Sequence, residues 1–176
     1  MKRRSGFMVV AALVVVAAVA LMGASAGDIQ QSPSCKYCGM DREKYAHSRM
    51  LVEYEDGTSL GTCSVHCLAV ELALAIDKTP KAIMVGDMGT KKLIDAEKAT
   101  WVIGGNKPGV MTKRAKWAFE NKADAEAFIK ENTGVLASFD EAIKTSYEDM
   151  YQDTKMIREK RKMKKKAAME QQHPAH

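Results

Sequence analysis

Four cysteines in two short-spaced pairs carry the most distinctive chemistry of the sequence. Two residues separate Cys35 from Cys38, and three separate Cys63 from Cys67. Such spacing is typical of sites that bind a soft metal ion or form disulfides, because each pair brings two sulfur atoms within reach of one centre. The sequence therefore predicts a sulfur-rich site, with the cysteines as its candidate ligands.

Three kinds of site are consistent with these sulfurs. Structural disulfides suit a small exported chain, because compartments outside the cytoplasm are oxidising. A closed four-thiolate zinc site suits two short-spaced pairs that flank a hairpin. A Cu(I) site is favoured by Met40, which follows Cys38 and Gly39 directly. A thioether is a poor ligand for zinc and a good one for cuprous ion.

Redox and enzymatic alternatives have weaker support. The CxxC motif of thiol-disulfide exchange enzymes usually begins a helix after a buried strand, whereas the polar segment 30–34 precedes Cys35 here. Covalent haem attachment needs a histidine where Gly39 stands. The sequence contains no recognisable Ser/His/Asp constellation, phosphate-binding glycine loop or paired carboxylates. We therefore expect a binding protein, and not an enzyme.

A hairpin is expected to bring the two cysteine pairs together. Residues 48–54 and 58–63 have the composition of short strands, and Asp56-Gly57 between them is a strong hairpin signal. Antiparallel pairing returns the end of the second strand to the start of the first. Both cysteine pairs should therefore lie at one end of the hairpin.

A helix is expected to follow this hairpin and to carry the second cysteine pair at its start. Ser64 is placed to cap a helix that runs to about Ile76. At a helix N-terminus the dipole favours thiolate over thiol, which prepares Cys67 as a ligand. His66, on the first turn, is expected to face solvent, with the metal of the same site as its alternative partner.

The same order of elements recurs further along the chain. After strands at 82–86 and 92–94, the sequence predicts strands over 100–103 and 115–119 and a helix over 122–132. The predicted fold class is α+β, with two small related strand-strand-helix units, short antiparallel sheets and a long C-terminal helix.

The last predicted element is a helix over 138–160. Ser138 and Glu141 form a capping box, and apolar residues recur at steps of three and four after it. The apolar stripe fades near Lys160, where a run of lysines begins. Residues 161–176 are therefore expected to be a basic tail that begins as a solvated, fraying helix and becomes disordered toward its end.

The charge of the protein is unevenly distributed. Residues 154–176 hold eight Lys or Arg against two Glu and carry +6, whereas residues 27–153 carry −4. The tail is expected to be a solubilising extension, with contact to an anionic membrane surface or an acidic partner as the alternative. Its cations are not interleaved with aromatic residues, so we expect no nucleic-acid partner.

The N-terminus has the pattern of a secretory signal peptide. Lys2, Arg3 and Arg4 precede an apolar run that ends near Met22, and Ala-Ser-Ala at 24–26 supplies a cleavage site. A retained membrane anchor is the alternative, since the run approaches the length that spans a bilayer. The expected location is the periplasm or cell envelope.

The 176 residues leave room for one modest domain or two very small ones. The predicted division is a signal peptide over 1–26, a linker over 27–34, a Cys-rich metal-binding unit over 35–94, a second unit over 95–137, a C-terminal helix over 138–160 and the basic tail over 161–176.

Several of these segments resemble the NosL family. The similar motifs are the Cys38-Gly39-Met40 triplet, the turn Tyr54-Glu55-Asp56-Gly57, Cys63-Ser64 before a helix, Val110-Met111 before a strand that ends at Ala118-Phe119, and the helix 123–131 followed by Gly134. The resemblance covers roughly residues 35–142.

The resemblance implies a copper-binding accessory protein linked to the maturation of nitrous oxide reductase. It implies a compact α+β fold of two related units, delivery of Cu(I) to a client cuproenzyme outside the cytoplasm, and no catalytic activity. The family's cysteine and methionine fall on Cys38 and Met40, and the methionine of its second unit falls on Met111.

The sequence also departs from the family pattern. Members are often lipoproteins, whereas this chain has an ordinary signal sequence. Cys35 and Cys67 complete two cysteine pairs, and Thr-Lys-Arg follows Met111 where the family suggests a glycine-containing turn. The extra pairs are expected either to extend the copper site or to form a second, structural metal site.

Overall fold

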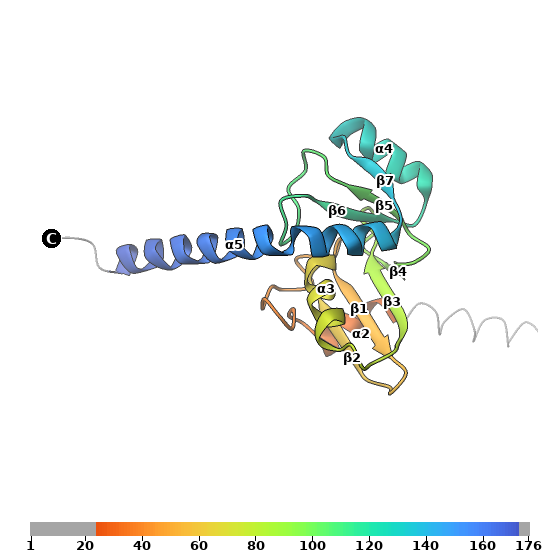
Figure 1. The fold of residues 1–176 in the computed structure, drawn as a ribbon, viewed down its shortest axis with the longest axis horizontal. Helices are drawn as coiled ribbons and strands as arrows, with labels where there is room; N and C mark the ends of the chain where they lie inside the picture. Colours follow the sequence, from red (N-terminus) through yellow and green to blue (C-terminus); the bar gives the residue numbers. More distant parts are fainter. Residues whose placement is uncertain (1–23, 173–176) are drawn as a thin grey trace, which may run out of the picture.

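The computed structural model describes residues 24–172 (Figure 1). Nearly all of the predicted signal peptide, residues 1–23, and the last four residues of the tail lie outside this range. The elements are α2 (Ala24–Gln31), β1 (Met50–Tyr54), β2 (Ser59–Thr62), α3 (Val65–Leu74), β3 (Pro80–Gly86), β4 (Leu93–Asp95), β5 (Thr100–Ile103), β6 (Lys116–Phe119), α4 (Lys122–Asn132), β7 (Val135–Ala137) and α5 (Phe139–Gln172).

The first sheet has the strand order β2-β1-β3-β4, with all pairs antiparallel. The predicted hairpin is present, because β1 pairs with β2 from Met50 opposite Thr62 to Glu53 opposite Ser59. Side chains alternate along β1, with Met50, Val52 and Tyr54 buried. The register places Cys63, one residue after β2, at the end of the sheet where β1 begins.

The second sheet has the order β6-β5-β7, again antiparallel. Both units share the order strand, strand, helix, strand, in which the first strand is flanked by the second and the third; the first unit adds β4 at the outer edge of β3. The α+β class and the two related units are confirmed. The third strand of this sheet was not predicted from sequence, because Val135–Ala137 is short and largely exposed. It follows Thr133 and Gly134, whose φ angles are 58° and 110°.

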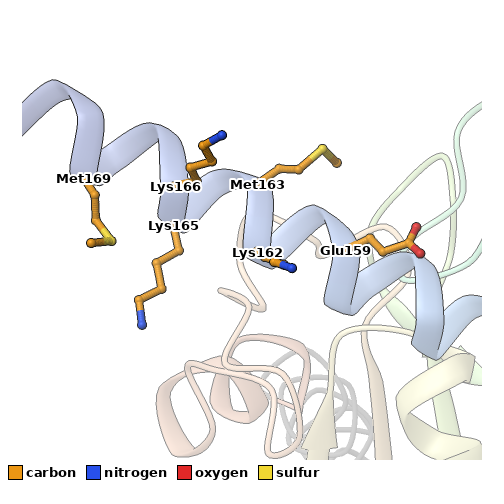
Figure 2. A pocket seen from close by; sticks show the side chains of 6 residues that line it. All are labelled: Glu159, Lys162, Met163, Lys165, Lys166 and Met169. Carbon is orange, nitrogen blue, oxygen red and sulfur yellow. The ribbon is translucent and has the colours of Figure 1, made fainter.

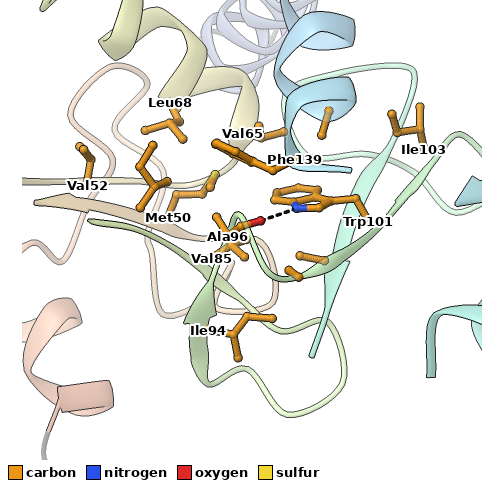
Figure 3. Packing of buried hydrophobic residues seen from close by; sticks show 14 of the residues in the cluster. Met50, Val52, Val65, Leu68, Val85, Ile94, Ala96, Trp101, Ile103 and Phe139 are labelled. Carbon is orange, nitrogen blue, oxygen red and sulfur yellow. Dashed lines mark hydrogen bonds between the residues drawn. The ribbon is translucent and has the colours of Figure 1, made fainter. Parts of the chain in front are cut away.

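Two buried clusters hold the units together. Alternation along β5 sends Trp101 and Ile103 into a cluster with the first sheet, α3 and α5, while Val102 joins a second cluster. The Trp101 indole donates to the carbonyl of Ala96 at 2.9 Å (Figure 3). The second cluster contains Cys35, Cys63, Cys67, Trp117 and Phe119, among others. The second sheet thus provides one wall of the core around the cysteines.

Helix α5 is longer than the sequence predicts. The capping box is confirmed, because the backbone amide of Ser138 donates to the Glu141 carboxylate at 2.7 Å and the Glu141 amide donates to Ser138 Oγ at 3.2 Å. The helix packs on α3 and β5 and then continues past both units (Figure 1). Residues 161–172 are helical, so the expected fraying helix extends to Gln172 and the assignment of these residues to a disordered tail is corrected. Lysine and arginine are good helix formers, which explains the continuation.

The predicted linker over 27–34 is also corrected. Residues up to Gln31 belong to α2, and Asp28 within it is buried. Between residues 24 and 172 there is no helix both long and apolar enough to cross a bilayer.

Candidate metal centre

The sulfur atoms of all four cysteines converge on one point between the units. They lie within 4.8 Å of one another. Cys38 Sγ is 3.4 Å from Cys63 Sγ, and Cys63 Sγ is 3.8 Å from Cys67 Sγ. All four are free thiols, with these separations well beyond the ~2.0 Å of a disulfide bond. The prediction that the hairpin brings the two pairs together therefore agrees with the structure.

A tight loop supplies the first pair. The amide of Cys35 donates to the carbonyl of Met40 at 2.8 Å, and the amide of Gly39 donates to the carbonyl of Cys35 at 2.9 Å. Gly39 has a φ of 72°, a left-handed conformation that glycine adopts without the steric cost of a side chain. A bridge between Ser34 and Asp41 closes the base of the loop. This backbone geometry turns both sulfurs of the pair to the same side.

The hairpin and the start of α3 supply the second pair. Cys63 lies between β2 and α3, and its carbonyl accepts a hydrogen bond from Ser48 Oγ at 2.9 Å. Cys67 follows in the first turn of α3. Ser64 occupies the N-cap position, although its side chain makes no capping hydrogen bond. The positive end of the helix dipole thus lies beside two sulfurs, as expected. Contact with the other cysteines and burial outweigh it, however, because the pKa values of Cys63 and Cys67 are raised and not lowered.

The two candidate thioethers lie at the margin of this core. Met40 and Met111 are half-buried, and both pack against the buried cluster that contains Cys35, Cys63 and Cys67. Met111 has a φ of 62°, which is rare for a residue with a side chain. Met88 packs against the same cluster. The ligand roles of Met40 and Met111 rest on the sequence pattern and belong to the proposal below.

The donor set suits a thiophilic cation. With metal–sulfur bonds of about 2.3 Å, a regular tetrahedron of four thiolates has edges of about 3.8 Å. The Cys63–Cys67 separation of 3.8 Å equals that edge, and the Cys38–Cys63 separation of 3.4 Å is slightly shorter. Soft thiolates select Cu(I) and zinc over hard cations such as calcium or magnesium.

Contact among the four thiols makes their ionisation interdependent. The thiols of Cys38, Cys63 and Cys67 contact Cys35 and lower its pKa. Contact with Cys35 in turn raises the pKa values of Cys63 and Cys67, and burial raises them further. One thiolate is therefore stabilised by its neighbours, whereas several thiolates repel one another. A bound cation would remove that repulsion and allow the remaining protons to leave.

A buried carboxylate fixes the loop to α3. Glu71, one turn after Cys67, accepts hydrogen bonds from the phenol groups of Tyr37 and Tyr54, the latter at 2.7 Å. Burial and these contacts with Glu71 raise the pKa values of both tyrosines, which remain neutral donors. Because Tyr37 lies between the first two cysteines, this contact holds their loop against the helix that carries Cys67.

A second buried network fixes the same loop to the hairpin. Asp28 bridges two buried arginines, at 2.7 Å from Arg42 and 2.9 Å from Arg49. Arg42 also donates to the carbonyls of Thr62 at 3.2 Å and Met50 at 3.0 Å. The network therefore joins α2, β1 and β2 to Arg42, which follows the loop that carries Cys35 and Cys38. Asp28 is 14 residues from Arg42 and 21 residues from Arg49 along the sequence, and no local sequence pattern indicates either pairing.

Comparison with known proteins identifies the family to which the sequence belongs. The sequence matches the NosL family model over residues 26–147. The chain belongs to the NosL family. No curated protein matches the sequence significantly. Among solved structures, that of the copper chaperone NosL from Shewanella denitrificans is 27% identical, with a TM-score of 0.50 over 62% of this chain and 89% of that chain.

In this NosL chain the long helix contacts the cysteine loop of the candidate metal centre directly. Arg161 Nη2 in α5 donates to the carbonyl of Cys38 at 2.9 Å, across 123 positions of sequence. Cys38 is the half-buried member of the cluster, while Cys35, Cys63 and Cys67 expose 3%, 0% and 2% of their surface. The contact therefore places a cationic helix beside the most accessible sulfur.

His66 differs from the sequence prediction. It is buried, with its Nδ1 3.6 Å from Asp153 Oδ2 of α5, and does not face solvent. Burial lowers the pKa of His66. In this NosL chain α5 packs over the first turn of α3 and covers the histidine. Sequence periodicity identifies the helix but not the element that packs on its outer face.

Proposed function

We propose that this protein binds Cu(I) outside the cytoplasm and passes it to a client cuproenzyme, with nitrous oxide reductase as the expected client. The observation that carries the proposal is the gathering of four cysteine sulfurs within 4.8 Å in a chain of the NosL family. The related structure is that of a copper chaperone, which supports copper as the cargo. The predicted signal peptide supports a periplasmic or cell-envelope location.

The proposed ligands are the thiolates and the neighbouring thioethers: Cys35, Cys38, Cys63, Cys67, Met40 and Met111. Thiolate and thioether sulfur both suit monovalent copper. The two extra cysteines that distinguish the sequence would then extend the copper site rather than form a separate one, because all four sulfurs share one centre.

Release would proceed by ligand exchange. Sulfur or imidazole groups of the client replace the protein's sulfurs one at a time, so that copper keeps its oxidation state and never leaves as a hydrated ion. Three cysteines are almost fully enclosed, and Cys38 is half-buried. The exchange would therefore begin at Cys38.

A structural zinc site is a second candidate, favoured by one observation. The Cys38–Cys63 and Cys63–Cys67 separations lie near the edge length of a tetrahedral zinc–tetrathiolate centre. Such a site is closed and serves the fold or an interaction. The two candidates differ in the metal retained and in whether a thiol-bearing acceptor can remove it.

Anaerobic titration of the metal-free, reduced protein with Cu(I) tests the proposal. We expect stoichiometric uptake accompanied by proton release, because the raised pKa values keep Cys63 and Cys67 protonated until a cation binds. Copper affinity should therefore fall as the pH is lowered, because protons compete for the thiolates, by about tenfold per pH unit for each proton displaced.

A parallel titration with Zn²⁺ and a competition between the two metals provide the control. Copper uptake that zinc does not reverse supports the chaperone. Firm retention of zinc with no copper uptake would contradict it and favour the structural site. Copper uptake without proton release would contradict the thiolate ligand set.

A further inference from the structure

The extension of α5 beyond the body carries a concentrated positive charge. Residues 154–172 hold eight Lys or Arg against two Glu. From Arg158 to Gln171 the side chains are exposed. Figure 2 shows Met163 and Lys166 pointing to one side of the helix in this view and Lys165 and Met169 to the other. Together with Glu159 and Lys162, these four side chains line a shallow hollow along the helix. Cations are therefore distributed around the helix and are not gathered in one amphipathic stripe.

The extension begins beside the accessible sulfur of the metal centre. Arg161 binds the carbonyl of Cys38 at 2.9 Å. Arg158 and Lys165 lie three residues before and four after it, and residues at these spacings share one face of a helix. Lys162 lies four residues after Arg158 and borders the same face. This face, defined by Arg158, Arg161, Lys162 and Lys165, is called the basic face below. It runs from the Cys38 loop outward along the helix.

From this juxtaposition we propose that the basic face is the docking surface for an acidic protein that exchanges copper with the cluster at Cys38. This inference rests on the proposed function and names the surface and the class of partner. The body carries −4 and the tail +6, so an acidic partner is repelled by the body and drawn to the extension. The positive electrostatic potential of the tail would therefore attract the partner to the neighbourhood of Cys38 Sγ, the sulfur with which copper exchange begins.

The exchange itself requires no oxidant or reductant. A sulfur of the partner forms a bond to Cu(I) while the bond from copper to Cys38 Sγ breaks, and the freed thiolate takes up a proton from water. The remaining sulfurs follow in the same way. A protein with sulfur ligands can complete these steps, whereas an anionic lipid surface offers the charge but no soft ligand. The position of the basic face next to Cys38 therefore favours a protein partner.

A triple charge reversal tests the proposal: Arg158→Glu, Lys162→Glu and Lys165→Glu in one chain. Arg161 is left intact, so the hydrogen bond to the cysteine loop is preserved. The matched control is Lys81→Glu, Lys92→Glu and Lys130→Glu, which makes the same charge change at exposed positions on β3, before β4 and on α4. Circular dichroism and stoichiometric copper loading establish that both variants are folded and functional.

The probe is a synthetic peptide in which a Met-x-x-Met copper-binding pair is flanked by glutamates, compared with one that carries lysine in place of each glutamate. We expect transfer of Cu(I) to the acidic peptide to be faster than to the basic one, and to slow by at least about tenfold in the basic-face variant but not in the control. High ionic strength should abolish the difference. Fluorescence anisotropy with metal-free protein measures docking without any copper step.

Equal transfer rates in the wild type, the basic-face variant and the control would overturn the inference. Vesicles of phosphatidylglycerol and phosphatidylcholine form a second arm. Binding to them that depends on the basic face, with unchanged transfer rates, would replace the protein partner by a membrane. Failure of the wild type to load copper would instead contradict the proposed function, and is thus distinguishable from failure of this inference.

Discussion

Replacement of Asp28 by alanine is expected to lower the free energy of unfolding by about 3–5 kcal/mol. The Asp28 carboxylate is 2.7 Å from Arg42 and 2.9 Å from Arg49, and the two arginine side chains are 0% and 1% exposed. Breaking one partner of a buried ion pair leaves an uncompensated charge in a medium of low polarity. Here one substitution removes the carboxylate that two buried guanidinium groups share.

The hydrogen bonds of Arg42 extend the expected effect to the metal centre. Besides Asp28, this residue binds the carbonyls of Ser32 at 2.6 Å and Thr62 at 3.2 Å. A side chain on Gly61 would come within 2.5 Å of its guanidinium carbon, so the strand and the arginine fit closely. Loosening of this contact should also weaken metal retention, because Thr62 directly precedes Cys63.

Urea unfolding followed by circular dichroism measures the change. Asp77→Ala, at an exposed turn position, is the matched control and should stay within about 0.5 kcal/mol of the wild type. A loss no larger than that of the control would show that the arginines are solvated and that α2 does not clamp the fold. Because Asp28 is two residues past the predicted cleavage site, chains trimmed beyond it should behave like Asp28→Ala.

Replacement of Cys63 by serine is expected to cause the largest loss of copper binding. Its sulfur is fully buried and lies 3.4 Å from Cys38 Sγ and 3.8 Å from Cys67 Sγ. A serine hydroxyl is a harder ligand and remains protonated near neutral pH, so the site loses both a soft donor and a negative charge. The loss of affinity should exceed the 10–100-fold that follows removal of an outer hydrogen-bond partner of a metal ligand.

Competition with a Cu(I)-specific chelator under anaerobic conditions gives the affinity. Met88→Leu is the matched control, because Met88 packs against the same buried cluster but is not a proposed ligand. Near-normal affinity in Cys63→Ser would contradict a centre built on all four sulfurs. Loss of affinity in the control would indicate that repacking of the core, and not ligation, governs binding.

Much of the framework around the cysteines was predictable from sequence. The hairpin follows from Asp56-Gly57 between two β-rich runs, and the start of α5 follows from the Ser138 and Glu141 capping box. Both signals are local, because turn chemistry and capping act over two to four residues. The approach of the two cysteine pairs was expected from the geometry of an antiparallel hairpin, which returns Cys63 to the end of the sheet where β1 begins.

The contacts that hold the centre in place were not predictable in the same way. Asp28 meets Arg42 and Arg49, Tyr37 meets Glu71, and Arg161 meets Cys38 across 123 residues. Each contact depends on how the formed helices and strands pack against one another, and no periodicity or spacing in the sequence indicates it. The same reason accounts for the burial of His66 under α5.

X-ray absorption spectroscopy on the copper-loaded, reduced protein tests the central claim most directly. The account predicts monovalent copper surrounded only by sulfur, with a signal that changes in Cys63→Ser and remains unchanged in Met88→Leu. A copper shell containing nitrogen or oxygen donors, or a sulfur shell unchanged by loss of Cys63, would contradict the assignment of the four converging cysteines as the copper site.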